Sequence, residues 1–177
     1  MNSTYIVLLR AFFDICIFRK RPQDIPFANE LFVVTMLMYL VVSAAISYPA
    51  HPSFAAFISG TVDTVMLVSV TYLFVYLRSV PKRWLQTTTA LAGTGFIFNL
   101  LALPLFYMRV YVSQEPASQS SIETLILLLV FWNLAVTSHI FRHAFSASYL
   151  LGLLASFTYI AMVTFALQII IPIPEVI

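Results

Sequence analysis

Five long apolar stretches, nearly free of charged residues, dominate the chain. They carry apolar residues on every helical face, and none alternates between apolar and polar positions as a strand of a membrane barrel does. About 20 helical residues are needed to cross a hydrocarbon layer of about 30 Å. The pattern therefore predicts five membrane-spanning helices, over about 31–48, 54–77, 85–108, 124–141 and 146–171.

Short polar or proline-containing segments separate these expected spans. Residues 48–52, 78–83 and 143–146 predict tight connections. The stretch 109–121 is longer and predicts a polar loop, and prolines after residue 171 are expected to end the last span. No internal repeat is visible, so nothing favours the inverted-repeat plan of many transporters.

The first part of the chain has a different pattern. Residues 3–19 are strongly apolar with a narrow polar stripe, because Arg10 and Asp14 are four residues apart and share one helical face. A basic run at 19–21 follows, and Pro22 interrupts the helix. The segment predicts an amphipathic helix that lies on the cytoplasmic leaflet or packs against the bundle, and both interpretations stay open. A sixth span would have to bury both charged residues.

Composition agrees with a membrane protein. Hydrophobic residues make up 61% of the 177 residues and charged residues 9%, where a soluble domain carries about 25%. This excludes a soluble enzyme, a nucleic-acid-binding module and a disordered tail. We expect an all-α polytopic membrane protein, with an amphipathic helix and linker over 1–30 and the five-span bundle over 31–177. Cys16 is the single cysteine, so an internal disulfide is excluded, and no cleavable signal peptide is expected.

Basic residues are distributed unevenly between the two sides of the expected bundle. Only Arg109 falls on one side, whereas the other eight of nine fall on the opposite side: Arg10, Arg19, Lys20, Arg21, Arg78, Lys82, Arg83 and Arg142. Lysine and arginine accumulate on the cytoplasmic side of membrane proteins. The N-terminus is therefore expected in the cytoplasm and the C-terminus outside it.

Three polar side chains fall in one layer near the middle of the expected spans. They are Asp63, Asn99 and Asn133, and Thr158 or Thr164 of the last span could join them. An intramembrane carboxylate suggests a proton or cation site, with the two amides as neighbouring ligands. The alternative is structural, because Asp and Asn side chains also hydrogen-bond across helices and fix their packing.

Other residue patterns give no sign of chemistry. His139 and His143 are four residues apart, as in a helical metal pair, but a third ligand and the glutamate of a zinc protease motif are missing. We interpret them as part of an interfacial polar belt. The chain has no phosphate-binding loop and no serine nucleophile motif. We expect no enzymatic activity, no catalytic residues, no metal and no cofactor.

The expected cytoplasmic face is the candidate surface for lipid or a partner. Its members are basic or imidazole side chains: Arg19, Lys20, Arg21, Arg78, Lys82, Arg83, His139, Arg142 and His143. The first hypothesis is a non-catalytic protein that binds, assembles or organises other membrane components. The alternative is a small transporter or channel for a proton, a cation or a lipid, centred on Asp63. Expected partners are membrane lipid and other membrane proteins or a second copy, and no nucleic acid.

Two segments carry a resemblance to a known family. Residues 131–144 place Trp132 and Asn133 ahead of a polar, basic end from His139 to His143, and residues 21–26 look like an entry motif of small proteobacterial membrane proteins. With five closely spaced helices and short loops, the chain resembles the bacterial branch of the Yip (Ypt-interacting protein) family over about 20–171. The resemblance implies membrane organisation or partner binding without catalysis, and a bacterial inner membrane with a periplasmic C-terminus.

Overall fold

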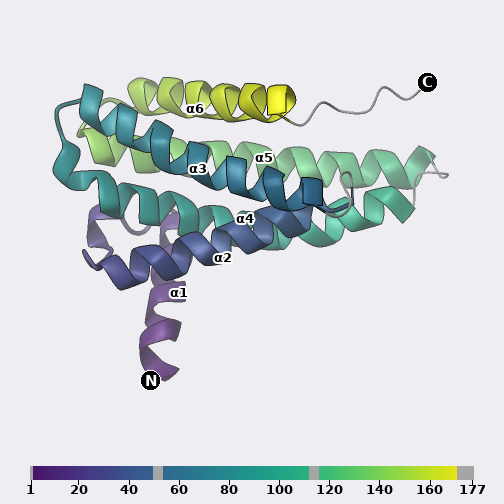
Figure 1. Cartoon of the computed structure of the whole chain (residues 1–177), viewed down its shortest axis with the longest axis horizontal. Helices are drawn as coiled ribbons and strands as arrows, with labels where there is room; N and C mark the ends of the chain where they lie inside the picture. The colour runs from purple at the N-terminus through teal and green to yellow at the C-terminus, as the bar shows by residue number, and fades with distance from the viewer. Residues whose placement is uncertain (1, 50–53, 112–115, 171–177) are drawn as a thin grey trace.

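Leu, Val, Phe and Ala fill the long apolar stretches, and in the computed structural model each of these stretches lies mostly within one α-helix. The structure describes residues 2–49, 54–111 and 116–170. These residues form six α-helices and no strand (Figure 1), with bounds α1 Asn2–Cys16, α2 Asn29–Ser47, α3 Phe54–Leu77, α4 Trp84–Tyr111, α5 Pro116–Phe145 and α6 Tyr149–Ile170. The predicted all-α fold is confirmed.

Five of these helices, α2 to α6, are long and apolar enough to cross a membrane, which confirms the predicted number of spans. Large apolar side chains such as Val41, Leu128 and Phe165 are exposed on their outer surfaces. A soluble protein rarely exposes contiguous apolar surface on this scale, whereas lipid tails are a favourable environment for it. The protein is therefore a multi-pass membrane protein.

The expected polar loop over 109–121 is wrong in extent. Helix α4 continues to Tyr111 and α5 begins at Pro116, so the helices include most of this stretch, while 112–115 lie outside the described residues. Proline is favourable in the first turn of a helix, because the amide hydrogen that it lacks would have no partner there. Polar residues outside the membrane can also extend a helix, and Arg109 and Glu123 join the two extensions through an ion pair of 3.6 Å.

Other connections are partly described. The expected turn at 143–146 starts later, because α5 continues to Phe145 and the backbone turns at Ser146, where φ is +50°. The middle of the expected connection 48–52 and the end of the last span at 171 lie outside the described residues.

Helix α4 is the central element of the bundle. It packs against α2, α3 and α5, and α6 completes the bundle by packing on α5 and α3. A small residue on α4 allows the close approach to α2: a Cβ on Gly95 would lie 2.6 Å from the ring of Tyr39 in α2. The interior is otherwise filled by large side chains such as Leu67, Phe98 and Phe141.

Helix α1 packs against the bundle. This is one of the two interpretations that the sequence left open for residues 3–19. It runs across the long axis of the other helices (Figure 1) and buries Ala11, Phe12, Ile15 and Cys16 against α4 and α5. The indole Nε1 of Trp132 donates a hydrogen bond of 3.0 Å to the Cys16 carbonyl oxygen. The opposite face, which includes Leu9 and Phe13, stays exposed, so contact with lipid on that face remains a prediction.

The burial of Cys16 leads to a prediction about its reactivity. Because burial raises the pKa of this thiol to about 12, the reactive thiolate is scarce at neutral pH. In native protein we expect maleimide labelling of Cys16 to be at least about 100-fold slower than that of an exposed thiol, and to rise with pH without a plateau below pH 10. The control is Arg10→Cys in a Cys16→Ala background, since Arg10 is exposed on the same helix. Labelling of Cys16 at the rate of this control would contradict the described packing of α1.

Basic residues gather at one end of the bundle. The start of α2, the end of α3, the start of α4, the end of α5 and the start of α6 all meet at the left of Figure 1. Most of the lysine and arginine residues belong to these termini or to the connections beside them, and Arg109 lies toward the other end of α4. We call this the basic end. Its location on the cytoplasmic side remains a prediction.

Candidate functional site

The structure brings Asp63 and Asn99 together through two side chains of α2. The Tyr39 hydroxyl donates to Asp63 Oδ2 at 2.8 Å, and the Ser43 hydroxyl donates to the same oxygen at 2.9 Å. The Asn99 amide in turn donates to Ser43 Oγ at 3.0 Å. One carboxylate therefore links α3 to α2, and Ser43 extends the link to α4.

A second set of hydrogen bonds continues this link along α2 and α3. Ser47 and Ser59 lie 3.1 Å apart, hydroxyl to hydroxyl, and Ser47 also donates to the Ser43 carbonyl oxygen at 2.9 Å. Tyr39, Ser43 and Ser47 are each four residues apart, so they form one polar stripe on a helix that is otherwise apolar. This spacing is visible in the sequence, but Tyr39 and Ser43 were not predicted as site residues from it.

Asn133 does not join this cluster, contrary to the predicted three-residue layer. Its side-chain oxygen accepts a hydrogen bond of 3.3 Å from Thr137, one turn further along α5. Thr158 bonds to the Leu154 carbonyl oxygen within α6 and, like Thr164, is exposed. Depth in the membrane remains a prediction, and depth alone does not say which way a helix faces.

An open cavity of about 420 Å³ lies between α2, α3 and α4 near the end opposite the basic end. Small and aromatic side chains line it: Ala44, Ala45, Tyr48, Ala56, Phe57 and Tyr107. Asp63 is not among these lining residues. Its hydroxyl partners instead hold it in a packed helix contact, the arrangement expected of a structural link rather than of an ion site.

The free energy of unfolding of Asp63 variants tests whether Asp63 is a structural link between helices. Asp63→Leu leaves the Tyr39 and Ser43 hydroxyls without their acceptor, and we expect the free energy of unfolding to fall by about 1–2 kcal/mol. Asp63→Asn keeps an oxygen that can accept both bonds, so we expect a loss below about 1 kcal/mol. Unfolding in bicelles by steric trapping measures both. The control is Asn133→Leu, which removes a hydrogen bond made within one helix, and equal losses for the two leucine variants would contradict the link.

At the basic end, Arg83 forms hydrogen bonds that stabilise the end of α5. The Arg83 Nη1 donates to the carbonyl oxygens of His143, at 3.3 Å, and Ala144, at 2.8 Å, and to Ser146 Oγ at 2.7 Å. Carbonyl groups in the last turn of a helix lack partners within that helix, and the helix dipole favours a cation there. Arg83 therefore has a structural role and is less available as a contact residue than the sequence suggested.

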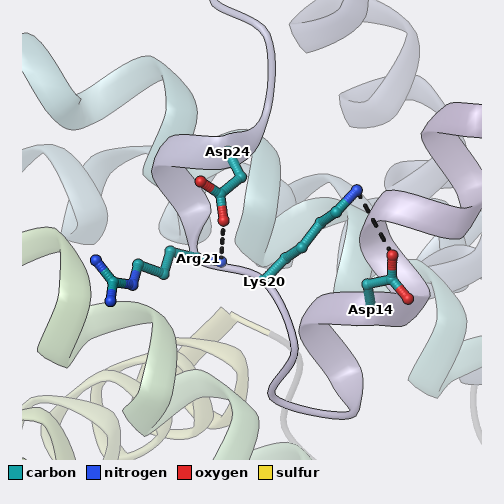
Figure 2. A network of polar contacts seen from close by, with 4 residues as sticks. All are labelled: Asp14, Lys20, Arg21 and Asp24. Atoms are coloured by element: carbon teal, nitrogen blue, oxygen red, sulfur yellow. Dashed lines mark hydrogen bonds and ion pairs between the residues drawn. The ribbon is translucent and has the colours of Figure 1, made fainter.

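Two glutamines hydrogen-bond the segment before α2 to the end of α5 and the start of α4. Gln23 donates to the His143 carbonyl oxygen at 2.7 Å, and Gln86 of α4 donates to the Ile25 carbonyl oxygen at 2.8 Å. The Asp24 carboxylate accepts a bond of 2.8 Å from the backbone amide of Arg21, and Lys20 forms an ion pair of 3.5 Å with Asp14 (Figure 2). These contacts hold residues 20–25 against α4 and α5.

The two histidines of α5 face this segment. Their ring centroids are 4.4 Å apart, and His139 Nε2 lies 3.1 Å from the Lys20 carbonyl oxygen. Because a carbonyl oxygen can only accept, the hydrogen is on Nε2 of His139. The described part of the chain contains no group of three His, Cys, Asp or Glu residues able to hold a metal. The pair has packing and hydrogen-bonding partners in this segment, and its place in an interfacial polar belt remains a prediction.

The candidate surface predicted from the sequence thus divides into two parts. Arg83 is engaged in fastening α5, and Lys20 is paired with Asp14. The remaining arginines and lysine are exposed at the basic end: Arg19, Arg21, Arg78, Lys82 and Arg142.

The chain matches no protein-family model, no curated protein and no solved structure. The resemblance to the Yip family, which rests on topology and two short segments, therefore stays a prediction.

Proposed function

We propose that this protein is a non-catalytic membrane protein that binds or organises other membrane components through its basic end and α1. The observation that carries the proposal is the attachment of α1 and residues 20–25 to α4 and α5. Hydrogen bonds from Trp132, Gln23 and Gln86 hold this segment in place. A rigidly held segment can present side chains to a partner with little further loss of conformational entropy.

The exposed residues of this region suit a membrane partner. Leu9, Phe13 and Phe18 are each about half exposed, and Arg19 and Arg21 are exposed close to them in the chain. Apolar side chains beside cations match either the headgroup boundary of a bilayer or another membrane protein at the same depth. A cytoplasmic location of this end and a bacterial inner membrane belong to the same proposal.

Site-specific photo-crosslinking in intact membranes tests the proposal. A photoreactive amino acid is placed at Phe13 or at Arg142, and at Phe165 of α6 as the control, because Phe165 is exposed far from the basic end. We expect mass spectrometry to find one stoichiometric product from the first two positions and not from Phe165. The same mixture of products from all three positions, or repeated failure to capture anything, would argue against a dedicated partner surface.

A second candidate function rests on the placement of Asp63 inside a membrane-spanning helix. We propose, as the alternative, a small transporter or channel for a proton, a cation or a lipid that uses this carboxylate. Flux in proteoliposomes tests it with Asp63→Asn, which preserves the size of the side chain and its acceptor oxygen. Flux that is lost in this variant supports the role, and flux that is unchanged eliminates it for the carboxylate.

A further inference from the structure

Four groups that can carry positive charge lie together where the connection after α1 meets the end of α5. His139 and His143 are in ring contact, and Arg142 lies between them in the sequence. The side chain of Arg21 extends away from Asp24 and toward α5 in Figure 2, and its charge acts on His143 together with that of Arg142. Three residues of α5 and one connection residue thus bring groups that can carry positive charge to a single surface.

The arginines of this surface lack acidic partners among the described residues. The ion pairs among the described residues join Lys20 to Asp14 and Arg109 to Glu123, and neither involves Arg21 or Arg142. Asp24 is the nearby acidic residue. Its carboxylate oxygen accepts a hydrogen bond from the Arg21 backbone amide, so it stabilises the turn and forms no ion pair with the Arg21 guanidinium. Both Arg21 and Arg142 are exposed, and their charge is available to an external anion.

Apolar and aromatic side chains adjoin the same surface. Phe18 is 47% exposed and contacts His139 edge to face, with ring centroids 5.4 Å apart. Trp132 is 37% exposed, two helical turns before His139 on α5, and its indole holds the end of α1. A free phosphate would gain nothing from these rings, whereas a phospholipid places acyl chains directly beside its phosphate.

We propose that Arg21 and Arg142, with His139 and His143 beside them, bind the phosphate of an anionic phospholipid, whose acyl chains lie along Phe18 and Trp132. Guanidinium groups suit this role because their fork of donors matches two phosphate oxygens. This proposal rests on the proposed function, and it specifies an anionic phospholipid as the membrane component that the basic end binds.

Native mass spectrometry of the purified full-length protein tests the site. The probes are phosphatidylglycerol and phosphatidylcholine with identical acyl chains, which differ in net charge. We expect phosphatidylglycerol to bind more tightly, and Arg21→Gln/Arg142→Gln to weaken its apparent affinity by about 25-fold, or about fivefold for each cation lost. The control for the single variant Arg142→Gln is Arg109→Gln, which removes the same charge at the opposite end of the bundle, and we expect a change of less than about threefold there.

Three outcomes would overturn the site. Equal loss of affinity in Arg142→Gln and Arg109→Gln would mean diffuse electrostatic attraction. Equal affinity for the two lipids would mean that the site does not recognise the net negative charge of the headgroup. Displacement of phosphatidylglycerol by millimolar inorganic phosphate would mean a site for a soluble anion. The crosslinking experiment at Phe13 is independent of these results, so a captured membrane protein together with no lipid preference would refute this site and leave the proposed function standing.

Discussion

Gly60→Val is expected to destabilise the bundle more than any other single substitution considered, by about 3 kcal/mol or more. A Cβ at this position would lie 2.7 Å from the backbone nitrogen and 2.9 Å from the Cβ of Ala44 in α2. Backbone atoms of a helix cannot rotate away as the end of a long side chain can, so α2 and α3 would have to separate. Separation would also stretch the Ser43–Asp63 and Ser47–Ser59 hydrogen bonds on either side of the contact.

The measurement is the free energy of unfolding by steric trapping in bicelles, with expression and detergent monodispersity recorded beside it. Ser69→Val is the matched control, because Ser69 is exposed on the same helix and the new side chain would point outward from the bundle. If Gly60→Val unfolds within about 1 kcal/mol of this control, the close contact between α2 and α3 is wrong.

Arg83→Met is expected to cost about 2 kcal/mol and to loosen the last turn of α5 selectively. The guanidinium satisfies two carbonyl oxygens and one hydroxyl at that helix end. A hydrogen bond to a charged group contributes about 1.5–3 kcal/mol, and a cation at a helix C-terminus adds a smaller favourable interaction with the dipole. Because Arg83 is only partly buried, solvent screening keeps the expected total at the lower end of that range.

Lys82→Met is the control for this prediction. It removes the same charge at the neighbouring position, but Lys82 is exposed, so we expect a change below about 0.5 kcal/mol. Hydrogen exchange of residues 140–147 should become faster in Arg83→Met and stay unchanged in the control. Equal exchange in the two variants would show that Arg83 contributes only its charge to this end of the protein.

The number and approximate position of the spans were predictable because they depend on composition over long windows. Twenty apolar residues must be helical in lipid, whatever their neighbours are, since every backbone amide needs a partner within its own segment. Helix ends were predicted less well where they leave the membrane. The stretch after Arg109 is polar, and polarity alone does not distinguish a loop from a helix that continues into water.

The polar cluster was predictable only in part, because its geometry depends on how helices face one another. Asp63 and Asn99 were recognised by their chemistry and by their depth, and the structure joins them through Ser43. Asn133 has similar chemistry and a similar predicted depth, but its hydrogen bond stays within α5. Rotation of a helix about its own axis has no clear signature in a sequence that is apolar on all faces.

The sequence by itself determined the all-α class, the five spans and the concentration of basic residues toward one side. These properties add up over many residues, so no single contact is needed to establish them. Only the tertiary structure decided that α1 packs against α4 and α5, that Tyr39 and Ser43 hold Asp63, and that Arg83 is engaged with α5. Each of these depends on atoms from helices far apart in the chain meeting at about 3 Å, and helix packing alone creates such meetings.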